Sequence, residues 1–374
     1  MRRGYYYSCV HLYVHVPFCQ RRCSYCDFSI AVRKRIPARE FVEAILWEAR
    51  GIELGEIETL YFGGGTPSLL PPDAISTLVM ELTSLRRTPH AAREVTLEAN
   101  PEDVTPDNAK AWHAAGINRV SLGSQSFDDG VLKWMHRSHD AARIGAAVHA
   151  LRGAGIDNIS LDLIFGLPTE LHRDWERDLE MALALRPTHL SLYGLTIEPR
   201  TPLDRWISRG ATKAPSDDRY AEEYLAAHRR LKADGFEFYE VSNAARDGFR
   251  SRHNSAYWSG KPYVGLGPAE HSFDGRTRRW NIRAWEAYRR ALVEGRSAVE
   301  SEETLTAEQR EMERVYLALR TSDGLPLTAA YRSPPPLTAQ GWITVSDGSL
   351  KCTPEGWLRL DSLVSELTMQ TETR

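Results

Sequence analysis

Residues 13–28 read Tyr-Val-His-Val-Pro-Phe-Cys-Gln-Arg-Arg-Cys-Ser-Tyr-Cys-Asp-Phe and hold three of the chain's five cysteines, Cys19, Cys23 and Cys26. The spacing Cys-x3-Cys-x2-Cys directly follows a short β-like run, residues 11–16, which a proline ends. Such a loop can turn its three sulfurs toward one centre, and thiolates suit zinc or iron–sulfur clusters. Structural zinc sites are closed by four protein ligands, so three cysteines favour an iron–sulfur cluster with one open iron.

The composition is that of a globular chain without strong charge. Of 374 residues, 42% are apolar and 26% charged, and the net charge is −3, which implies no general attraction to nucleic acid or membrane. No run approaches the roughly 18 apolar residues of a spanning helix, and residues 1–9 lack the apolar core of a signal peptide. Clustered cysteines are not a disulfide framework. We therefore expect a cytoplasmic protein without a nucleic-acid partner; a homodimer and a peripheral membrane contact stay open.

Strands and helices alternate over the first two thirds of the chain. Predicted helices cover residues 37–51, 71–85, 105–115, 140–154, 173–185 and 216–233. Between them lie β-branched and aliphatic runs, at residues 11–16, 57–62, 94–99, 119–123, 158–165, 189–196 and 236–241. This α/β pattern predicts parallel strands with crossover helices, in either an open doubly wound sheet or a barrel.

Residues suited to chemistry follow these strands at the point where each one ends. In a barrel of alternating strands and helices, functional groups gather at the carboxyl ends of the strands. One rim would then collect Cys19, Gly64, Glu98, Gln125, Asp162 and Gly194.

The composition and the periodicity of the sequence change after about residue 243. Residues 247–275 are rich in Gly, Asn, Ser and aromatics and show little periodicity, whereas residues 281–294 and 306–319 are predicted helices. A proline run at residues 334–336 marks a break, and residues 340–367 read as a β-ribbon and a helix, as in a small winged-helix-like module. We predict two domains, residues 5–243 and 244–374.

The cysteine spacing after a strand resembles the signature of the radical S-adenosylmethionine superfamily. The resemblance implies a partial (β/α)6 TIM-like barrel followed by a smaller mixed α+β domain. It also implies a [4Fe–4S] cluster on Cys19, Cys23 and Cys26, whose fourth iron S-adenosylmethionine chelates before reductive cleavage to a 5′-deoxyadenosyl radical. The cofactors would perform that step, and the protein would orient them.

Further motifs resemble the coproporphyrinogen dehydrogenase (HemN) branch. Residues 63–67 read Gly-Gly-Gly-Thr-Pro, Glu98 lies in Leu-Glu-Ala-Asn-Pro, and Gln125 lies in Gly-Ser-Gln-Ser-Phe. Glycines allow a close approach of the backbone to a ligand, and carboxylates can accept from ribose hydroxyls or an ammonium group. Glu98 or Asp162, taken alone, would be an ordinary solvated loop acid about as often as a ligand contact. By this resemblance the S-adenosylmethionine contacts are Tyr13, Tyr25, Gly64, Gly65, Thr66, Glu98, Gln125, Arg137, Asp162 and Gly194.

Two features distinguish the branches of that group. Phe28 stands where the dehydrogenases carry a fourth cysteine, and only twelve residues precede Tyr13 where they have a longer extension. Residues 253–258 read His-Asn-Ser-Ala-Tyr-Trp, which resembles the His-Asn-x-x-Tyr-Trp motif of HemW-type haem chaperones. Both features favour a chaperone.

The resemblance makes His253, Tyr257 and Trp258 the expected haem contacts. A neutral imidazole can ligate haem iron, and aromatic rings can pack on a porphyrin face. A lone histidine is nonetheless more often a hydrogen-bonded structural residue, and His271 is a rival ligand. Six arginines in residues 276–290 can meet haem propionates or an acidic acceptor, or can form a solvated helix face.

Two functions remain in view. The first is a haem chaperone that binds a [4Fe–4S] cluster, S-adenosylmethionine and haem and passes haem to an acceptor haemoprotein. The second is a radical oxidoreductase acting on a porphyrin, such as an oxygen-independent coproporphyrinogen III dehydrogenase. Phe28 and the motif at residues 253–258 favour the first; the complete apparatus for radical generation favours the second, and whether the chain is an enzyme stays open.

Overall fold

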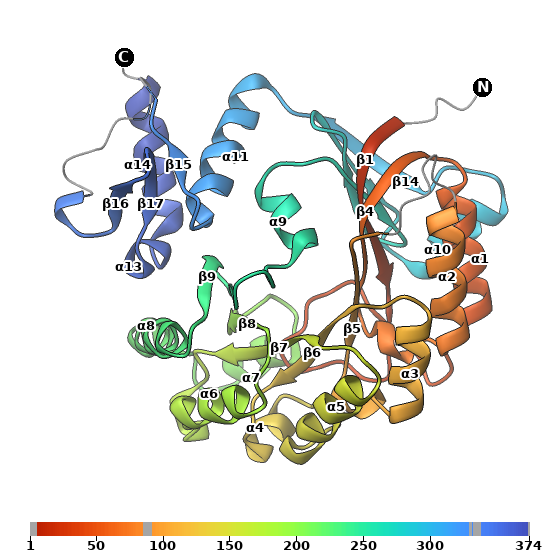
Figure 1. Cartoon of the computed structure of the whole chain (residues 1–374), viewed down its shortest axis with the longest axis horizontal. Helices are drawn as coiled ribbons and strands as arrows, with labels where there is room; N and C mark the ends of the chain where they lie inside the picture. The colour runs from red at the N-terminus through yellow and green to blue at the C-terminus, as the bar shows by residue number, and fades with distance from the viewer. Residues whose placement is uncertain (1–5, 85–91, 329–330, 332–337, 373–374) are drawn as a thin grey trace.

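The computed structural model describes residues 6–84, 92–328, 331 and 338–372. Its centre is a curved run of parallel strands that encloses the interior of the molecule, with helices on the outer face (Figure 1). In sheet order the parallel strands are β1 (Tyr6–Val16), β4 (Glu53–Gly64), β5 (Glu94–Ala99), β6 (Arg119–Gln125), β7 (Asn158–Phe165) and β8 (His189–Gly194). The prediction of a partial (β/α)6 barrel is confirmed, and the open doubly wound sheet is excluded.

Crossover helices connect these strands, and most begin at a side-chain cap. Thr105 caps its helix by accepting a hydrogen bond from the Asn108 N–H (3.1 Å), with proline at the first helical position. Asp140 and Ser216 do the same, and each such cap contributes about 1 kcal/mol. The helices are α1 (Ala38–Ala49), α2 (Pro72–Ser84), α3 (Pro106–Ala114), α4 (Asp129–Trp134), α5 (Ala141–Gly153), α6 (Trp175–Ala184), α7 (Pro202–Ser208) and α8 (Asp217–Ala233).

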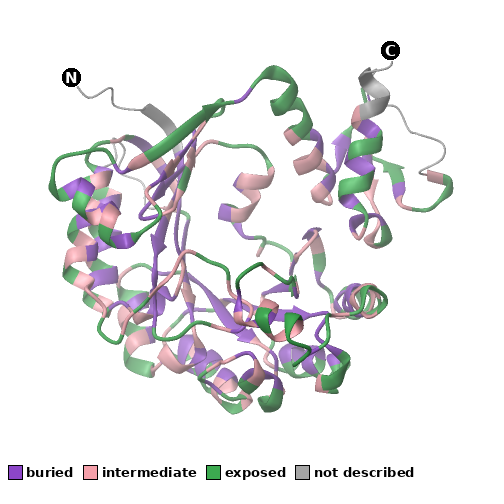
Figure 2. Cartoon of the chain, turned by 180° about the vertical axis from the view of Figure 1, so that it is seen from behind, coloured by how far each residue is buried: buried purple, intermediate pink, exposed green. Residues whose placement is uncertain are grey.

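A large hydrophobic core fills the space between the helices and the strands (Figure 2). Trp112 of α3 and Phe62 of β4 are fully buried in it. Burying a side chain of this size favours folding by roughly 1.5–3 kcal/mol. Strand-derived aliphatic residues such as Leu161 pack there against helix residues such as Leu151, which is why the strands read as continuous apolar runs.

The sheet extends beyond the barrel strands at both edges. Next to β1 lie β11 (Tyr263–Leu266), paired in parallel, and then the antiparallel strands β12 (His271–Phe273), β13 (Thr277–Asn281) and β14 (Val299–Thr304). At the opposite edge lie β10 (Asn243–Ala245) and β9 (Glu237–Glu240). Both are antiparallel to their neighbours, because the short link between them allows a hairpin and no crossover. The predicted strand at residues 236–241 therefore exists and runs in the same direction as β8, but β10 lies between them, so among the described residues it has no parallel partner.

Residues 247–275, expected to have little regular structure, contain helix α9 (Arg252–Trp258) and the two strands β11 and β12. Residues 277–281, partly assigned to a helix from the sequence, are strand, so helix α10 begins later (Trp285–Val293). Because this sheet crosses residues 243 and 244, the division of the chain there stays a prediction.

Helix α11 (Ala307–Arg320) spans the gap between the two sheet edges (Figure 1). It follows β14 directly, and its Glu313 accepts from Arg278 of β13 at 2.7 Å. At its other end, Thr321 forms a β-bridge with Glu240 of β9, and Arg320 Nε donates to the fully buried Glu240 carboxylate at 3.0 Å. The helix thus joins the edges that the incomplete barrel leaves open.

The C-terminal segment forms a small module with its own hydrophobic core. Val315 and Leu319 of α11 pack there against Ile343, Leu350 and Leu363. The predicted ribbon and helix are present; the proline run at residues 334–336 lies outside the described residues. The module contains β15 (Leu325–Pro326), β16 (Ile343–Ser346), β17 (Ser349–Cys352), α13 (Pro354–Trp357) and α14 (Leu360–Glu372).

Candidate functional site

The cysteine loop begins at the carboxyl end of β1 and is held by a two-stranded sheet, β2 (Phe18–Cys19) with β3 (Ala31–Val32). Cys19 is buried, whereas Cys23 and Cys26 are half-buried. The Thr66 hydroxyl lies 3.4 Å from Cys19 Sγ, and Arg137 Nη1 lies 3.6 Å from Cys23 Sγ. Both contacts come from segments that follow other barrel strands, so the loop faces the rim where those strands end.

The three thiols suit a metal cluster better than a single ion. Over the described ranges, no three His, Cys, Asp or Glu side chains come together as ligands of one metal ion. A [4Fe–4S] cluster makes a different demand, because each thiolate binds a different iron atom. Burial raises the pKa of Cys19 and raises that of Cys26 to about 11, so thiolates here need a cationic partner. The Arg137 guanidinium beside Cys23 supplies part of that charge.

The glycine motif packs directly on the cysteine loop. Gly65 N–H donates to Val16 O at 2.8 Å, and a Cβ at Gly65 would lie 2.7 Å from Phe18 O and 3.0 Å from Cys19 Sγ. Gly64 has φ +107°, in the left-handed region that favours glycine. No larger residue would let the two loops approach this closely.

Glu98 lies next to this motif at the end of β5. Its carboxylate accepts from Gly64 N–H (3.1 Å) and from the Tyr61 hydroxyl (2.8 Å), and burial raises its pKa to about 7. Tyr61 stacks on Tyr13, with ring centroids 5.6 Å apart. Tyr61 was not among the predicted site residues; its place two residues before the glycine motif is the only signal for it in the sequence.

Arg137 connects the cluster loop with the strand ends. Nη2 donates to Asn100 Oδ1 (2.6 Å) and to Gly123 O (2.9 Å), while the buried Nε has no partner among the described groups. Burial opposes its charge, but the facing Tyr25 and Cys23 raise the pKa of Arg137 above its usual value. A buried cation with an unused donor fits an anionic group at this rim, such as a carboxylate.

Three further residues are predicted S-adenosylmethionine contacts: Gln125, Asp162 and Gly194. Gln125 ends β6 with φ +65°. Asp162 accepts from Ser121 (2.9 Å) and Ser160 (3.2 Å), and burial raises its pKa. A Cβ at Gly194 would overlap the Tyr220 ring, so packing already explains that glycine. Contact of Gln125, Asp162 and Gly194 with a cofactor stays a prediction.

His253 lies at the start of α9, which the Glu94 carboxylate fixes by accepting from the Arg252 N–H (2.8 Å) and the His253 N–H (3.0 Å). The imidazole is 1% exposed, and both nitrogens are engaged: Nδ1 with Thr59 Oγ1 at 2.7 Å and Nε2 with the Tyr257 hydroxyl at 2.9 Å. Burial lowers its pKa well below the usual value. In this arrangement the ring is a packed, neutral side chain rather than an open ligand.

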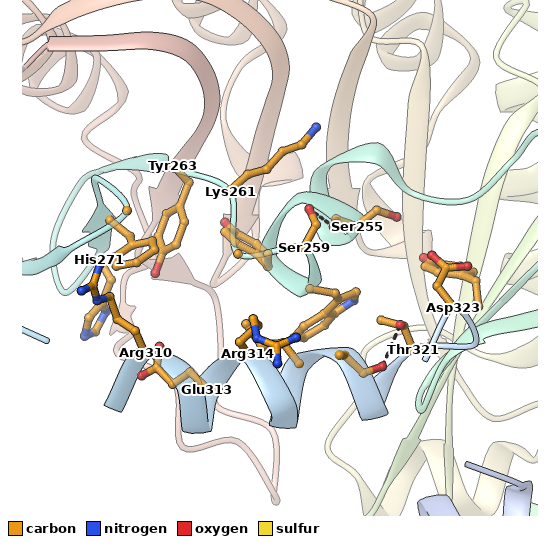
Figure 3. Close-up of a pocket in the computed structure, with 18 of the residues that line it drawn as sticks. Ser255, Ser259, Lys261, Tyr263, His271, Arg310, Glu313, Arg314, Thr321 and Asp323 are labelled. Carbon is orange, nitrogen blue, oxygen red and sulfur yellow. Dashed lines mark hydrogen bonds between the residues drawn. The ribbon is translucent and has the colours of Figure 1, made fainter. Parts of the chain in front are cut away.

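Tyr257 and Trp258 line a cavity of about 1000 Å³ between α9 and α11 (Figure 3). Tyr13 also lines it, so the cavity reaches the rim that carries the predicted cofactor contacts. His271 lines the same cavity. The arginine-rich segment does not form one helix face: it divides between β13 and α10, and of its arginines only Arg278 lines the cavity.

Known proteins are similar to this chain over nearly its whole length. Residues 13–182 match the model of the radical SAM superfamily. The chain is 37% identical to the heme chaperone HemW of Mycobacterium tuberculosis over 95% of this chain and 94% of that protein. It is 32% identical to HemW of Bacillus subtilis, over 84% of each. The chain belongs to the HemW family.

HemW relatives are not confined to proteins with that name. The mouse mitochondrial radical S-adenosyl methionine domain-containing protein 1 is 33% identical over 96% of this chain and 88% of its own length. Among solved structures, coproporphyrinogen III oxidase (HemN) from Escherichia coli superposes with a TM-score of 0.79, covering 98% of this chain and 91% of that one. At 22% identity this likeness shows the shared fold alone.

Proposed function

We propose that this chain is a haem chaperone that carries a [4Fe–4S] cluster, S-adenosylmethionine and haem and transfers the haem to an acceptor haemoprotein. The observation that carries the proposal is the end-to-end match to HemW chaperones. The geometry supports it, because the helix with the His-Asn-x-x-Tyr-Trp motif forms one wall of a cavity of about 1000 Å³. Pockets for large cofactors have this size and mixed aromatic and polar lining.

Roles for the residues at the rim follow from their contacts. Cys19, Cys23 and Cys26 would hold the cluster, and Arg137 would balance its thiolate charge. Gly64 N–H and the Tyr61 hydroxyl hold the Glu98 carboxylate, which would contact S-adenosylmethionine. When bound, the two cofactors supply one-electron cleavage chemistry; the protein's own contribution is to position them and to exclude water.

A radical oxidoreductase acting on a porphyrin is the second function, and the complete set of predicted S-adenosylmethionine contacts favours it. Phe28 argues against coproporphyrinogen dehydrogenation. It stands at the position of the dehydrogenases' fourth cysteine, and its side chain is 61% exposed, beside the cysteine loop.

One anaerobic preparation tests both functions. After reconstitution of the cluster, we expect a Soret band on addition of haem, transfer of that haem to an apo-haemoprotein, and no decarboxylation of coproporphyrinogen. Robust formation of protoporphyrinogen would contradict the chaperone and support the oxidoreductase.

A homodimer, a cytoplasmic location and the lack of a nucleic-acid partner are also part of the proposal. In the described part of the chain, no helix combines the length and apolar character that crossing a bilayer requires. Sedimentation of the purified protein with and without haem tests the homodimer: a mass of one chain under both conditions would contradict it.

A further inference from the structure

We propose that haem occupies the cavity between α9 and α11 and that His271, rather than His253, is the protein ligand of its iron. This inference rests on the proposed chaperone function and assigns the residues that would carry it. Three observations support it: the accessibility of the two histidines, the aromatic and apolar walls, and the cations at the cavity.

His253 is poorly placed to ligate a metal. Thr59 and Tyr257 occupy its nitrogens, and its ring lies 4.9 Å from the ring of Tyr61. An iron bond would break at least one buried hydrogen bond and leave a buried polar group without a partner, which is unfavourable. Moving the ring would also disturb the helix start that Glu94 fixes.

His271 has the opposite character. It lies on β12, its side chain is exposed, and it lines the cavity. Within the described ranges neither ring nitrogen makes a hydrogen bond or an ion pair; the ring contacts only Trp280, with centroids 5.9 Å apart. An unengaged imidazole is the common protein ligand of haem iron.

The walls of the cavity suit a flat aromatic macrocycle. Tyr257, Tyr263 and Phe273 line one side, while Leu317 and Ala318 of α11 line the other. Aromatic side chains in offset or edge-to-face contact stabilise a bound ring system beyond the area they bury. In Figure 3, His271 and Tyr263 lie at the same end of the cavity as Arg310.

Arg310 is a cation placed to meet a propionate. Five cationic side chains line the cavity, against the acidic residues Glu270, Glu313 and Asp323. Arg278 pairs with Glu313, Arg250 with Asp323 and Arg314 with Glu311. Among the described residues, Arg310 makes no ion pair, and only its Nε is used, on Thr306 O at 3.4 Å. Its guanidinium can therefore take a carboxylate in a charge-assisted hydrogen bond.

The test is a haem titration of the full chain followed by Soret absorption and electron paramagnetic resonance of the ferric state. The variants are His271→Ala, Arg310→Glu and His253→Ala. His149→Ala, an exposed histidine on α5 away from the cavity, is the control. Circular dichroism and thermal melting establish that each variant folds.

We expect His271→Ala to weaken haem binding at least tenfold and to change the Soret maximum, and added imidazole to restore the wild-type spectrum. Arg310→Glu should weaken binding about fivefold without changing the spectrum, because it affects a propionate and not the iron. His149→Ala should match the wild type, and His253→Ala should keep the wild-type ligand signature.

Unchanged affinity and spectrum in His271→Ala would overturn the assignment of the ligand. Loss of the ligand signature in His253→Ala alone would transfer that role to His253. Unchanged binding in both His271→Ala and Arg310→Glu would overturn the cavity itself. A wild-type chain that binds no haem would instead refute the proposed function, so the two failures are distinguishable.

Discussion

The two halves of the proposed site are built in different ways. The cluster half uses residues that follow the parallel strands β1, β4, β5 and β6, each placed by its position at a strand end. The cavity half lies between two helices, α9 and α11, that distant contacts hold in place. Glu94 fixes α9, and Glu240 fixes the end of α11. A site at strand ends follows from local periodicity, whereas a site between helices depends on long-range pairing.

The halves are nonetheless joined, because Tyr13 contributes to both. Its ring stacks on Tyr61 beside Glu98, and it also lines the cavity. If the halves work independently, changes in one should leave ligand binding in the other intact.

The largest effect is expected from Cys23→Ala. Removal of one of the three predicted ligands should abolish the visible absorbance of the [4Fe–4S] cluster completely, because the loop has no other thiol to replace it. Haem affinity should stay within about twofold of the wild type, since the cavity does not include the loop. Anaerobic reconstitution with iron and sulfide determinations provides the measurement.

The matched control is Cys352→Ala, which removes a thiol from the C-terminal module. It should keep the full cluster signal. A complete cluster in Cys23→Ala would refute the ligand assignment, and a parallel loss of haem binding would show that the two halves are coupled.

The second-largest effect is expected from Glu94→Gln. The change removes the charge from a carboxylate that accepts backbone N–H groups at the start of α9 and that lies near the buried Arg119. Hydrogen bonds to charged groups contribute about 1.5–3 kcal/mol, so we expect the free energy of unfolding to fall by about 2–3 kcal/mol. Haem affinity should fall as well, because α9 forms a wall of the cavity.

Chemical denaturation measures this change, with the exposed Glu180→Gln on α6 as the control, expected within about 0.5 kcal/mol of the wild type. Glu94→Gln with wild-type stability would show that α9 is held by its apolar contacts alone. The long-range anchoring of the cavity half would then be wrong.

This difference between the halves explains how far the sequence could predict the structure. The strands predicted at residues 94–99 and 158–165 have the same bounds in the structure, because apolar runs between helices have few other arrangements. The alternation of strands and helices likewise predicts the rim where the glycine motif lies between Cys19 and Glu98. Family membership confirms the resemblance to HemW that the motifs indicate, whereas the roles of the individual site residues stay predictions.

The sequence could not reveal the strands of residues 263–304. β12 has three residues and β14 reads Val-Glu-Ser-Glu-Glu-Thr, without apolar alternation. Pairing with β13 holds them, through contacts such as Arg279 with Glu302 at 3.1 Å. Nor could the motif show that the His253 side chain is buried and that of His271 exposed. The hydrogen-bond partner of His253, Thr59, lies far away in the sequence.

A smaller effect is expected at Glu48 of α1, which contacts β13, α10 and the turn after β11. Its carboxylate accepts from Gly267 N–H (2.9 Å), Asn281 Nδ2 (2.6 Å) and the Tyr288 hydroxyl (2.5 Å), and burial raises its pKa from 4.5 to about 7. The native state therefore holds this proton more tightly than the unfolded state. Its stabilising contribution is complete below about pH 4.5 and is lost as the pH rises through 7.

Glu48→Gln, which resembles the protonated acid, should remove about 2 kcal/mol of the fall in stability between pH 5 and pH 8. Urea denaturation at several pH values measures the slope. Since Glu98 has a raised pKa too, the informative quantity is the difference between variant and wild type. Identical slopes would mean that Glu48 does not titrate in this range.

The smallest effect is expected at Glu98, and it probes the independence of the two halves most finely. Glu98→Gln keeps the shape of the side chain but replaces a charged acceptor with a neutral one, so S-adenosylmethionine should bind about tenfold more weakly, or about 1.4 kcal/mol. Tyr61→Phe removes only the hydroxyl that orients the carboxylate and should have a weaker effect in the same direction.

Because burial raises the pKa of Glu98 to about 7, the affinity of the wild type for S-adenosylmethionine should fall from pH 8 to pH 6, while that of Glu98→Gln should show little change. Equilibrium dialysis on the reconstituted protein measures all three. Haem affinity should stay constant throughout; if Glu98→Gln weakens haem as much as S-adenosylmethionine, Tyr13 transmits changes between the halves and they form a single site.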